Sequence, residues 1–92
     1  MKAWELLDQK GWCRGTYAVD AGGNSVSVGA ETATAFCANG ALLKVYPGYD
    51  DYFSAYDKLL KRVRPIAGTV PKWNDSQTSA EPVIALLKEL DI

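Results

Sequence analysis

The chain has 92 residues, of which 48% are hydrophobic and 23% charged, with a formal net charge of −1 and no histidine. This composition excludes an intrinsically disordered chain, and the lack of excess positive charge argues against nucleic acid as a partner. Histidine is the commonest general base and metal ligand, so its absence favours a non-catalytic protein with no cofactor and no bound metal.

The length predicts a single domain over residues 1–92. Acidic residues interrupt the N-terminal segment 1–8, where a signal peptide needs an apolar run, and no segment resembles a membrane span of roughly 18 apolar residues. We therefore expect a cytoplasmic protein that does not contact membranes. In that compartment Cys13 and Cys37 stay reduced, and their spacing matches no zinc or redox motif.

The first third of the chain predicts a short helix followed by a β-hairpin. Apolar residues recur at helical spacing over residues 2–9, and Lys10-Gly11 is a typical helix stop. The segments Thr16–Val19 and Val26–Val28 then read as two strands, because Gly, Asn and Asp between them favour a tight turn. A lone hairpin is marginal in water, so we expect a helix to cover it.

The segment Ala30–Tyr46 has almost no polar face, which predicts a helix buried on all sides. Its small residues, Ala38, Gly40 and Ala41, would let neighbouring backbones approach closely. We expect this helix to be the central element of the fold, ended by Pro47-Gly48.

The segment Tyr49–Arg64 shows the clearest periodicity, with one aromatic and aliphatic face and one charged face. Asp50 and Asp51 fall in its first turn and four basic residues near its end, an arrangement that complements the helix dipole. Pro65 is predicted to stop this helix. The same acidic residues could suggest a metal, but no further ligands accompany them.

Residues 65–77 read as a connecting loop because they contain Pro65, Gly68, Pro71 and a polar run. The segment from Thr78 to Glu81 fits a capping box and predicts a final leucine-rich helix that reaches Leu90. Together these elements predict an α+β, predominantly helical fold. Three or four helices pack around the central helix, and the small hairpin covers one side.

Three short motifs carry a family resemblance. They are Gly11-Trp12, the stretch Ala35–Leu42 with its aromatic-Cys-x-x-Gly-Ala-Leu pattern, and Trp73-Asn74-Asp75 before the last helix. Their order and spacing resemble a family of small bacterial and phage proteins known only as a domain of unknown function, over about Gly11 to Leu90. Phe36 stands where such proteins often have tryptophan. The resemblance implies a fold but no activity, substrate or cofactor.

The aromatic content suggests an interaction surface. Tyrosine and tryptophan are enriched at the centres of protein interfaces, and the chain has more large rings than a small core can hold. Four tyrosines gather around the start of one helix: Tyr46, Tyr49, Tyr52 and Tyr56. Our leading hypothesis is a small interaction module that binds a protein partner or a second copy of itself through these residues.

A second hypothesis is a small-ligand or enzymatic site formed by Trp12, Cys13, Trp73, Asn74 and Asp75. Arg14 could stabilise a Cys13 thiolate, but no histidine is available as its base. The structural interpretation of the second motif is that Trp73 packs on the core while Asn74 or Asp75 bonds backbone amides near a helix start. Cys37 reads as a small buried hydrophobe.

Overall fold

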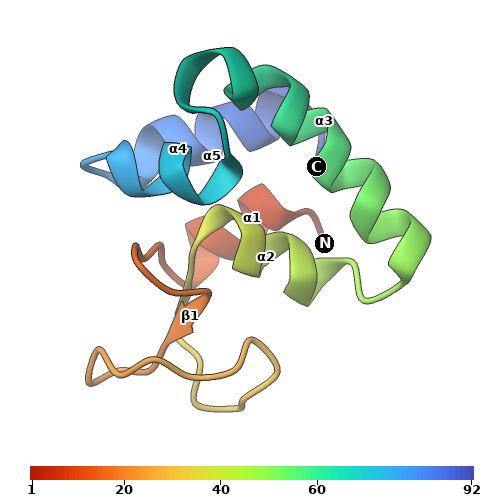
Figure 1. Ribbon diagram of the computed structural model, residues 1–92. Helices are drawn as coiled ribbons and strands as arrows, with labels where there is room; N and C mark the ends of the chain where they lie inside the picture. Colours follow the sequence, from red (N-terminus) through yellow and green to blue (C-terminus); the bar gives the residue numbers. More distant parts are fainter.

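A computed structural model describes all residues from 1 to 92. Five helices and one two-stranded antiparallel sheet make up the fold (Figure 1), so the predicted α+β, predominantly helical class is confirmed. The elements in chain order are α1 (Ala3–Gln9), β1 (Ala18–Val19), β2 (Ala35–Phe36), α2 (Ala38–Val45), α3 (Tyr49–Ala67), α4 (Val70–Ser76) and α5 (Ala80–Glu89).

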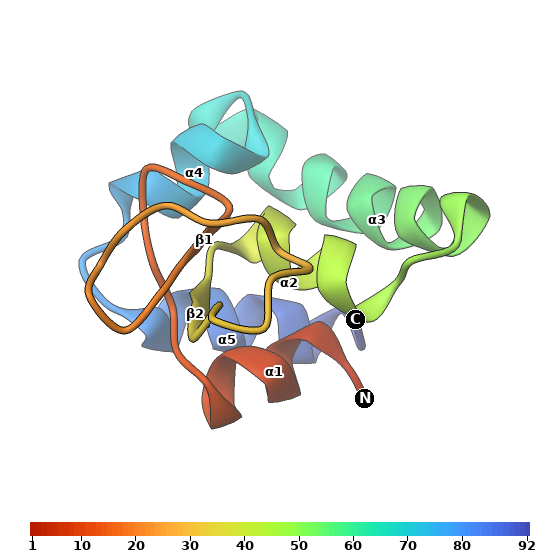
Figure 2. The same ribbon diagram turned by 90° about the horizontal axis from the view of Figure 1, so that it is seen from below.

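Helix α2 is the centre of the molecule. It lies between α3 and α4 on one side and α1 on the other (Figure 2), and Ala38, Ala41 and Leu42 are fully buried. Gly40 is buried because the backbone of Tyr17 lies directly against it, leaving no room for a side chain. The predicted central helix is therefore present over residues 38–45 but is buried only over residues 38–42, because Leu43 and Val45 are half-buried and Lys44 is exposed.

The predicted helix was wrong over residues 30–37. Ala35–Phe36 forms β2, and the preceding residues form turns. Cys37 is still extended, with φ −77° and ψ 174°, and its sulfur accepts a hydrogen bond from the Gly40 N–H at 3.2 Å, which caps α2. A short apolar run fits a buried strand as well as a buried helix, so periodicity alone could not locate this boundary.

The predicted hairpin is only partly present. Its turn forms, because the Asp20 carboxylate accepts the N–H groups of Gly22 and Asn24 at 2.9 Å each, and Gly23 takes a positive φ of 82°. The predicted second strand, Val26–Val28, does not form, since β1 pairs with β2, with Ala18 opposite Phe36. Only an isolated bridge between Val19 and Ser25 and a hydrogen bond from the Val26 N–H to the Ala18 carbonyl oxygen at 3.0 Å link β1 to that part of the chain. The long connection between the two strands packs against one side of the helices.

The prediction that Pro65 ends the third helix was wrong. The helix continues through Pro65 to Ala67 and ends at Gly68, which adopts a φ of 87°. Proline removes only one backbone hydrogen bond there, to the carbonyl of Lys61, and it lies in the exposed last turn, where this loss is tolerated.

The predicted loop 65–77 was also wrong, because residues 70–76 form helix α4. Thr69 caps it by accepting the N–H of Lys72 at 3.2 Å, and Pro71 stands in the first turn, where its missing N–H costs nothing. Helix α5 begins after Ser79, with no side-chain cap, so the capping box predicted from Thr78 and Glu81 is absent.

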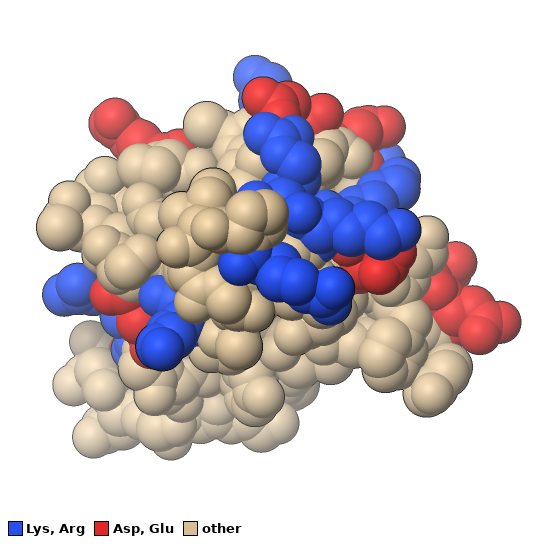
Figure 3. Space-filling model, turned by 45° about the horizontal axis from the view of Figure 1, so that its top comes forward, with Lys and Arg blue, Asp and Glu red and all other residues tan.

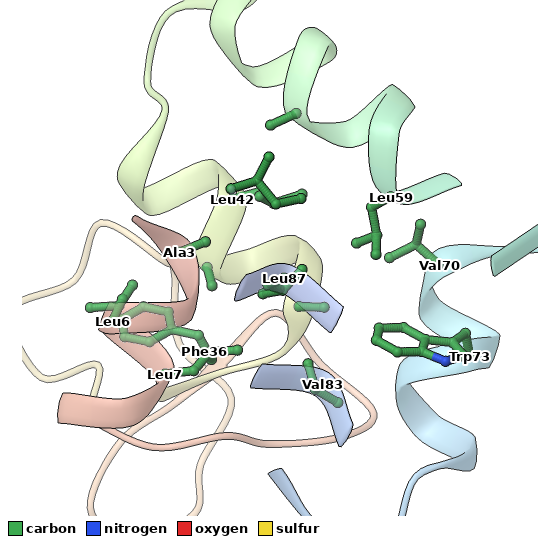
Figure 4. Packing of buried hydrophobic residues seen from close by; sticks show 14 of the residues in the cluster. Ala3, Leu6, Leu7, Phe36, Leu42, Leu59, Val70, Trp73, Val83 and Leu87 are labelled. Carbon is green, nitrogen blue, oxygen red and sulfur yellow. The ribbon is translucent and has the colours of Figure 1, made fainter. Parts of the chain in front are cut away.

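One hydrophobic cluster includes buried side chains from every helix and from both strands (Figure 4). The Trp73 indole points from α4 into this cluster and is 5% exposed. Helix α1 packs on α5, where the Ala3 N–H donates to the Ile92 carbonyl oxygen at 2.6 Å and the Tyr46 hydroxyl reaches the same residue at 3.1 Å. No helix combines the length and the apolar character needed to traverse a lipid bilayer.

Candidate functional site

The buried side chain of Asn74 joins three segments that are far apart in sequence. Its Oδ1 accepts hydrogen bonds from the Trp12 indole Nε1 at 2.8 Å and from the Ala38 N–H at 2.9 Å. Its Nδ2 donates to the Cys13 carbonyl oxygen at 3.1 Å and to Asp75 Oδ1 at 3.0 Å. All hydrogen-bonding positions of the amide are therefore used inside the chain.

The amide that Asn74 satisfies is at the first residue of α2. We expected Asn74 or Asp75 to bond backbone near the start of the following helix, so the role matches the prediction but the helix is a different one. Of the five residues in the ligand-site hypothesis, Trp12, Cys13, Asn74 and Asp75 come together. Trp73 lies apart from them in the core, as the structural interpretation predicted.

Arg14 does not activate the neighbouring thiol. Its guanidinium lies over the Trp12 ring, 5.9 Å from the centroid, and donates to the Gln77 carbonyl oxygen at 3.1 Å. Burial raises the pKa of Cys13 from 9.0 to about 11, with further contributions from the nearby Cys37 and Asp75. The Cys13 thiol is consequently protonated and a poor nucleophile near neutral pH.

Cys37 behaves in the same way and has a second role. Burial raises its pKa, so this thiol is also neutral at physiological pH. Both cysteines are free, and Cys37 is 6% exposed, as expected for a small buried hydrophobe. The sequence did not reveal that its sulfur caps α2, because cysteine is not among the preferred N-cap residues.

Cys37 also borders a cavity of about 350 Å³ between α4 and the loop that precedes β1. The seven lining residues are Gly15, Thr16, Tyr17, Cys37, Pro71, Asn74 and Asp75. Asn74 and Asp75 were singled out in the sequence, whereas the loop residues carried no motif. The loop and α4 are held together by the Gly15 N–H, which donates to Asp75 Oδ1 at 3.0 Å. No local sequence pattern predicts this contact.

The four tyrosines proposed as an interface have different surroundings. The Tyr46 hydroxyl bonds the Ile92 carbonyl oxygen, and the Tyr52 hydroxyl donates to Asn39 Oδ1 at 2.6 Å, so both tie helices together. Burial raises the pKa of Tyr52, while its bond to Asn39 opposes this shift. Tyr49 is 76% exposed, and Tyr56 is half-buried.

Phe53 belongs to the same surface, although we did not include it in the sequence-based set. It is 47% exposed, and its ring centroid lies 4.7 Å from that of Tyr49 and 5.2 Å from that of Tyr52. Tyr52 in turn lies 5.7 Å from Tyr56. The spacing of these residues along the helix was a readable signal for their common face.

Charged side chains divide α3 into two halves. Asp50 and Asp51 begin the helix, and the basic residues Lys58, Lys61, Arg62 and Arg64 follow in its second half. Figure 3 shows basic side chains gathered on one face, with acidic ones around them at the top, at the left and at the right-hand edge. Lys61 pairs with Asp57 at 3.0 Å, and Arg62 pairs with Glu89 of α5, whereas Asp50 and Asp51 form no ion pair.

No three His, Cys, Asp or Glu side chains are grouped so that they could hold a metal ion.

The model of a family of unknown function, DUF6197, matches residues 1–90. The chain belongs to this family. The match confirms the resemblance to an uncharacterised domain and extends it to the first helix, while the bacterial or phage origin stays a prediction. No curated protein and no solved structure matches the chain, so the geometry described above carries the functional argument.

Proposed function

We propose that this protein is a non-catalytic interaction module in which α3 pairs with α3 of a second copy. The observation that carries the proposal is a stripe of four residues, Tyr49, Phe53, Tyr56 and Leu60, which we call the α3 seam. Their successive spacings of four, three and four residues are those of the seam positions in paired helices. Tyr49 and Phe53, at one end of the seam, are 76% and 47% exposed.

The seam lies beside the side of α3 that packs on the core, and only its first half is open. Tyr49 and Phe53 are exposed, whereas Tyr56 and Leu60 are half-buried against the hydrophobic cluster. Ala55, Leu59 and Val63 form the buried stripe that packs on the core. With 3.6 residues per turn, the seam lies beside this stripe on the same cylinder. Tyr52 anchors the helix to α2 through Asn39, so the seam is presented by a fixed backbone. A helix whose apolar side continues into exposed aromatic residues offers a surface on which another helix can pack.

The charge pattern of α3 favours a second copy as the partner. On one flank of the seam, Asp50 near the start and Lys61 in the second half are separated by the same eleven positions as Tyr49 and Leu60. In an antiparallel pair related by a two-fold axis, Asp50 of each copy faces Lys61 of the other, which within one chain pairs with Asp57 at 3.0 Å. An isologous interface requires this kind of self-complementarity, and acidic and basic halves of one helix supply it.

The absence of an activated nucleophile supports the non-catalytic part of the proposal. Both thiols have a raised pKa, and the Asn74 amide is fully engaged in hydrogen bonds within the chain. Neither of the two thiols near Asn74 is therefore available as a thiolate nucleophile near neutral pH.

Sedimentation velocity over a range of concentrations tests the pairing. We expect the wild-type mass to rise from 10.0 kDa toward twice that value, and added salt to weaken the association by screening the Asp50–Lys61 contacts. Phe53→Glu places a charge in the seam and should hold the protein at the monomer mass. Ala85→Glu is the matched control, because Ala85 is an exposed residue of α5 and lies outside α3, and it should still associate.

Two results would overturn the proposal. One is a wild-type protein that stays at the mass of one chain at a concentration on the order of 1 mM. The other is an association that Phe53→Glu and Ala85→Glu weaken equally, because that outcome would mean that the α3 seam is not the contact. Circular dichroism of both variants would establish that the helices are intact.

A further inference from the structure

The cavity beside α4 is a candidate ligand site, and this inference does not depend on the pairing of α3. Its volume of about 350 Å³ lies at the lower end of the range of small-molecule sites. The loop Gly15–Tyr17 forms one wall, α4 forms the other with Pro71 and Asp75, and the buried thiol of Cys37 lies between them. The site is built by segments about sixty residues apart, held together by the bonds of Asn74 and Asp75.

The cavity has one charge, and that charge is negative. Asp75 is the only carboxylate in the lining, no basic residue lies there, and burial raises the pKa of the Cys37 thiol. The Asp75 Oδ1 atom is fixed by the Gly15 N–H and by Asn74 Nδ2, while its Oδ2 atom has no partner in the chain. The neighbouring cation Arg14 is engaged by Trp12 and Gln77 and forms no ion pair with Asp75.

The remaining walls offer an aromatic ring and an apolar surface. Tyr17 lines the cavity and is 52% exposed, and no hydrogen bond holds its hydroxyl. Aromatic faces attract organic cations, and a carboxylate adds a charge-assisted hydrogen bond to an ammonium group. A single carboxylate does not suffice for a divalent metal ion, and an anion would be repelled.

From this arrangement we propose that the cavity binds a small organic cation, a primary amine with a compact apolar body. The ammonium group donates to the free Oδ2 of Asp75, and the apolar part contacts the ring of Tyr17 and the side chain of Pro71. The Asn74 network does not change on binding, because its amide already holds the two walls in place.

Benzylamine is a suitable probe, with benzyl alcohol as its neutral counterpart of similar shape. In a titration of the ¹⁵N-labelled protein followed by NMR, benzylamine should shift the amide signals of Gly15, Thr16 and Tyr17 in a saturable manner. We expect a dissociation constant on the order of 1 mM, as befits one ion pair and a small apolar contact. Benzyl alcohol should bind at least tenfold more weakly. Equal shifts with both compounds, or no saturable shifts, would overturn the proposal.

Two variants locate the binding. Asp75→Asn keeps an oxygen that can accept the Gly15 N–H, so the fold is retained, and it should weaken benzylamine binding at least tenfold. Asp57→Asn is the matched control on α3 and should bind as the wild type does. The α3 seam variant Phe53→Glu should also bind normally, which separates this site from the pairing proposal. Binding that Asp75→Asn leaves unchanged would contradict the assignment.

Discussion

The Asn74 amide has all of its hydrogen-bond partners inside the chain. Along the first half of α3, by contrast, aromatic rings are exposed to solvent beside the carboxylates of Asp50 and Asp51, which form no ion pair. Both regions are rich in the residue types found at binding sites. Only their surroundings distinguish them. A Trp-Asn-Asp motif that looks functional in sequence joins segments of the fold, while tyrosines that could have filled a core are partly left on the surface.

Removal of the Asn74 side chain should have the largest effect. Asn74→Ala leaves the Trp12 indole N–H, the Ala38 N–H and the Cys13 carbonyl oxygen without their partner. We expect the free energy of unfolding, measured in urea, to fall by about 3 kcal/mol, since stranded buried polar groups are costly. Asn24→Ala is the control, because Asn24 lies in an exposed turn, and a similar loss there would contradict the distinction.

The Cys13 thiol offers a second test of the Asn74 region. A pKa of about 11 in the folded protein, against 9.0 in the unfolded chain, should slow alkylation by iodoacetamide at pH 8 about a hundredfold relative to protein in urea. Above pH 9 the unfolded chain loses this proton and the folded one does not, so stability should fall between pH 9 and about 11. Mass spectrometry measures the rate at Cys13, and equal rates in the two states would refute the prediction.

Gly40→Ala tests the closest backbone approach in the same region. A Cβ atom at Gly40 would overlap the carbonyl group of Tyr17, which accepts the Cys37 N–H at 3.1 Å. We expect the unfolding free energy to drop by about 2 kcal/mol, because the displacement outweighs the better helix propensity of alanine. Gly48→Ala, with an ordinary contact for its Cβ, should be nearly neutral. A neutral Gly40→Ala would show that the two segments separate easily.

Matched hydroxyl deletions compare the two kinds of tyrosine on α3. Tyr52→Phe removes the bond to Asn39 and should cost about 1 kcal/mol in unfolding free energy. Tyr49→Phe removes a hydroxyl with no partner in the chain, so about 0.3 kcal/mol or less is expected, within the usual range for surface substitutions. Chemical denaturation at low protein concentration measures both. Similar costs would mean that the α3 seam is not an open surface.

Local patterns predicted the elements that are amphipathic along their whole length. The first helix, α3 and α5 each show an apolar stripe, and their existence followed from the spacing of that stripe. The errors occurred where tertiary contacts decide. A Pro65 in an exposed last turn does not end a helix, and the short strand at Ala35–Phe36 exists because β1 pairs with it. Neither effect is visible in the flanking residues.

Of the candidate sites, the aromatic stripe on α3 was predictable from the sequence, whereas the surroundings of Asn74 were not. The exposed aromatic stripe follows from helical spacing, and Phe53 could have been included on that ground alone. The partners of Asn74 could not have been predicted, because Trp12 and Ala38 reach it only through the arrangement of β2, α2 and α4. The cavity lining depends on the same arrangement, so its loop residues carried no signal in the sequence.

The position of Asn74 has a consequence for the order of folding. The Ala38 amide obtains its acceptor from a residue 36 positions further along the chain, after α4 has docked. Contacts of such long sequence separation bear a high loop-closure entropy and are expected late. In a pulse-labelling hydrogen-exchange experiment, the Ala38 amide should therefore become protected after the amides in the middle of α3. Its protection would mark the step at which the N-terminal loop, α2 and α4 come into contact.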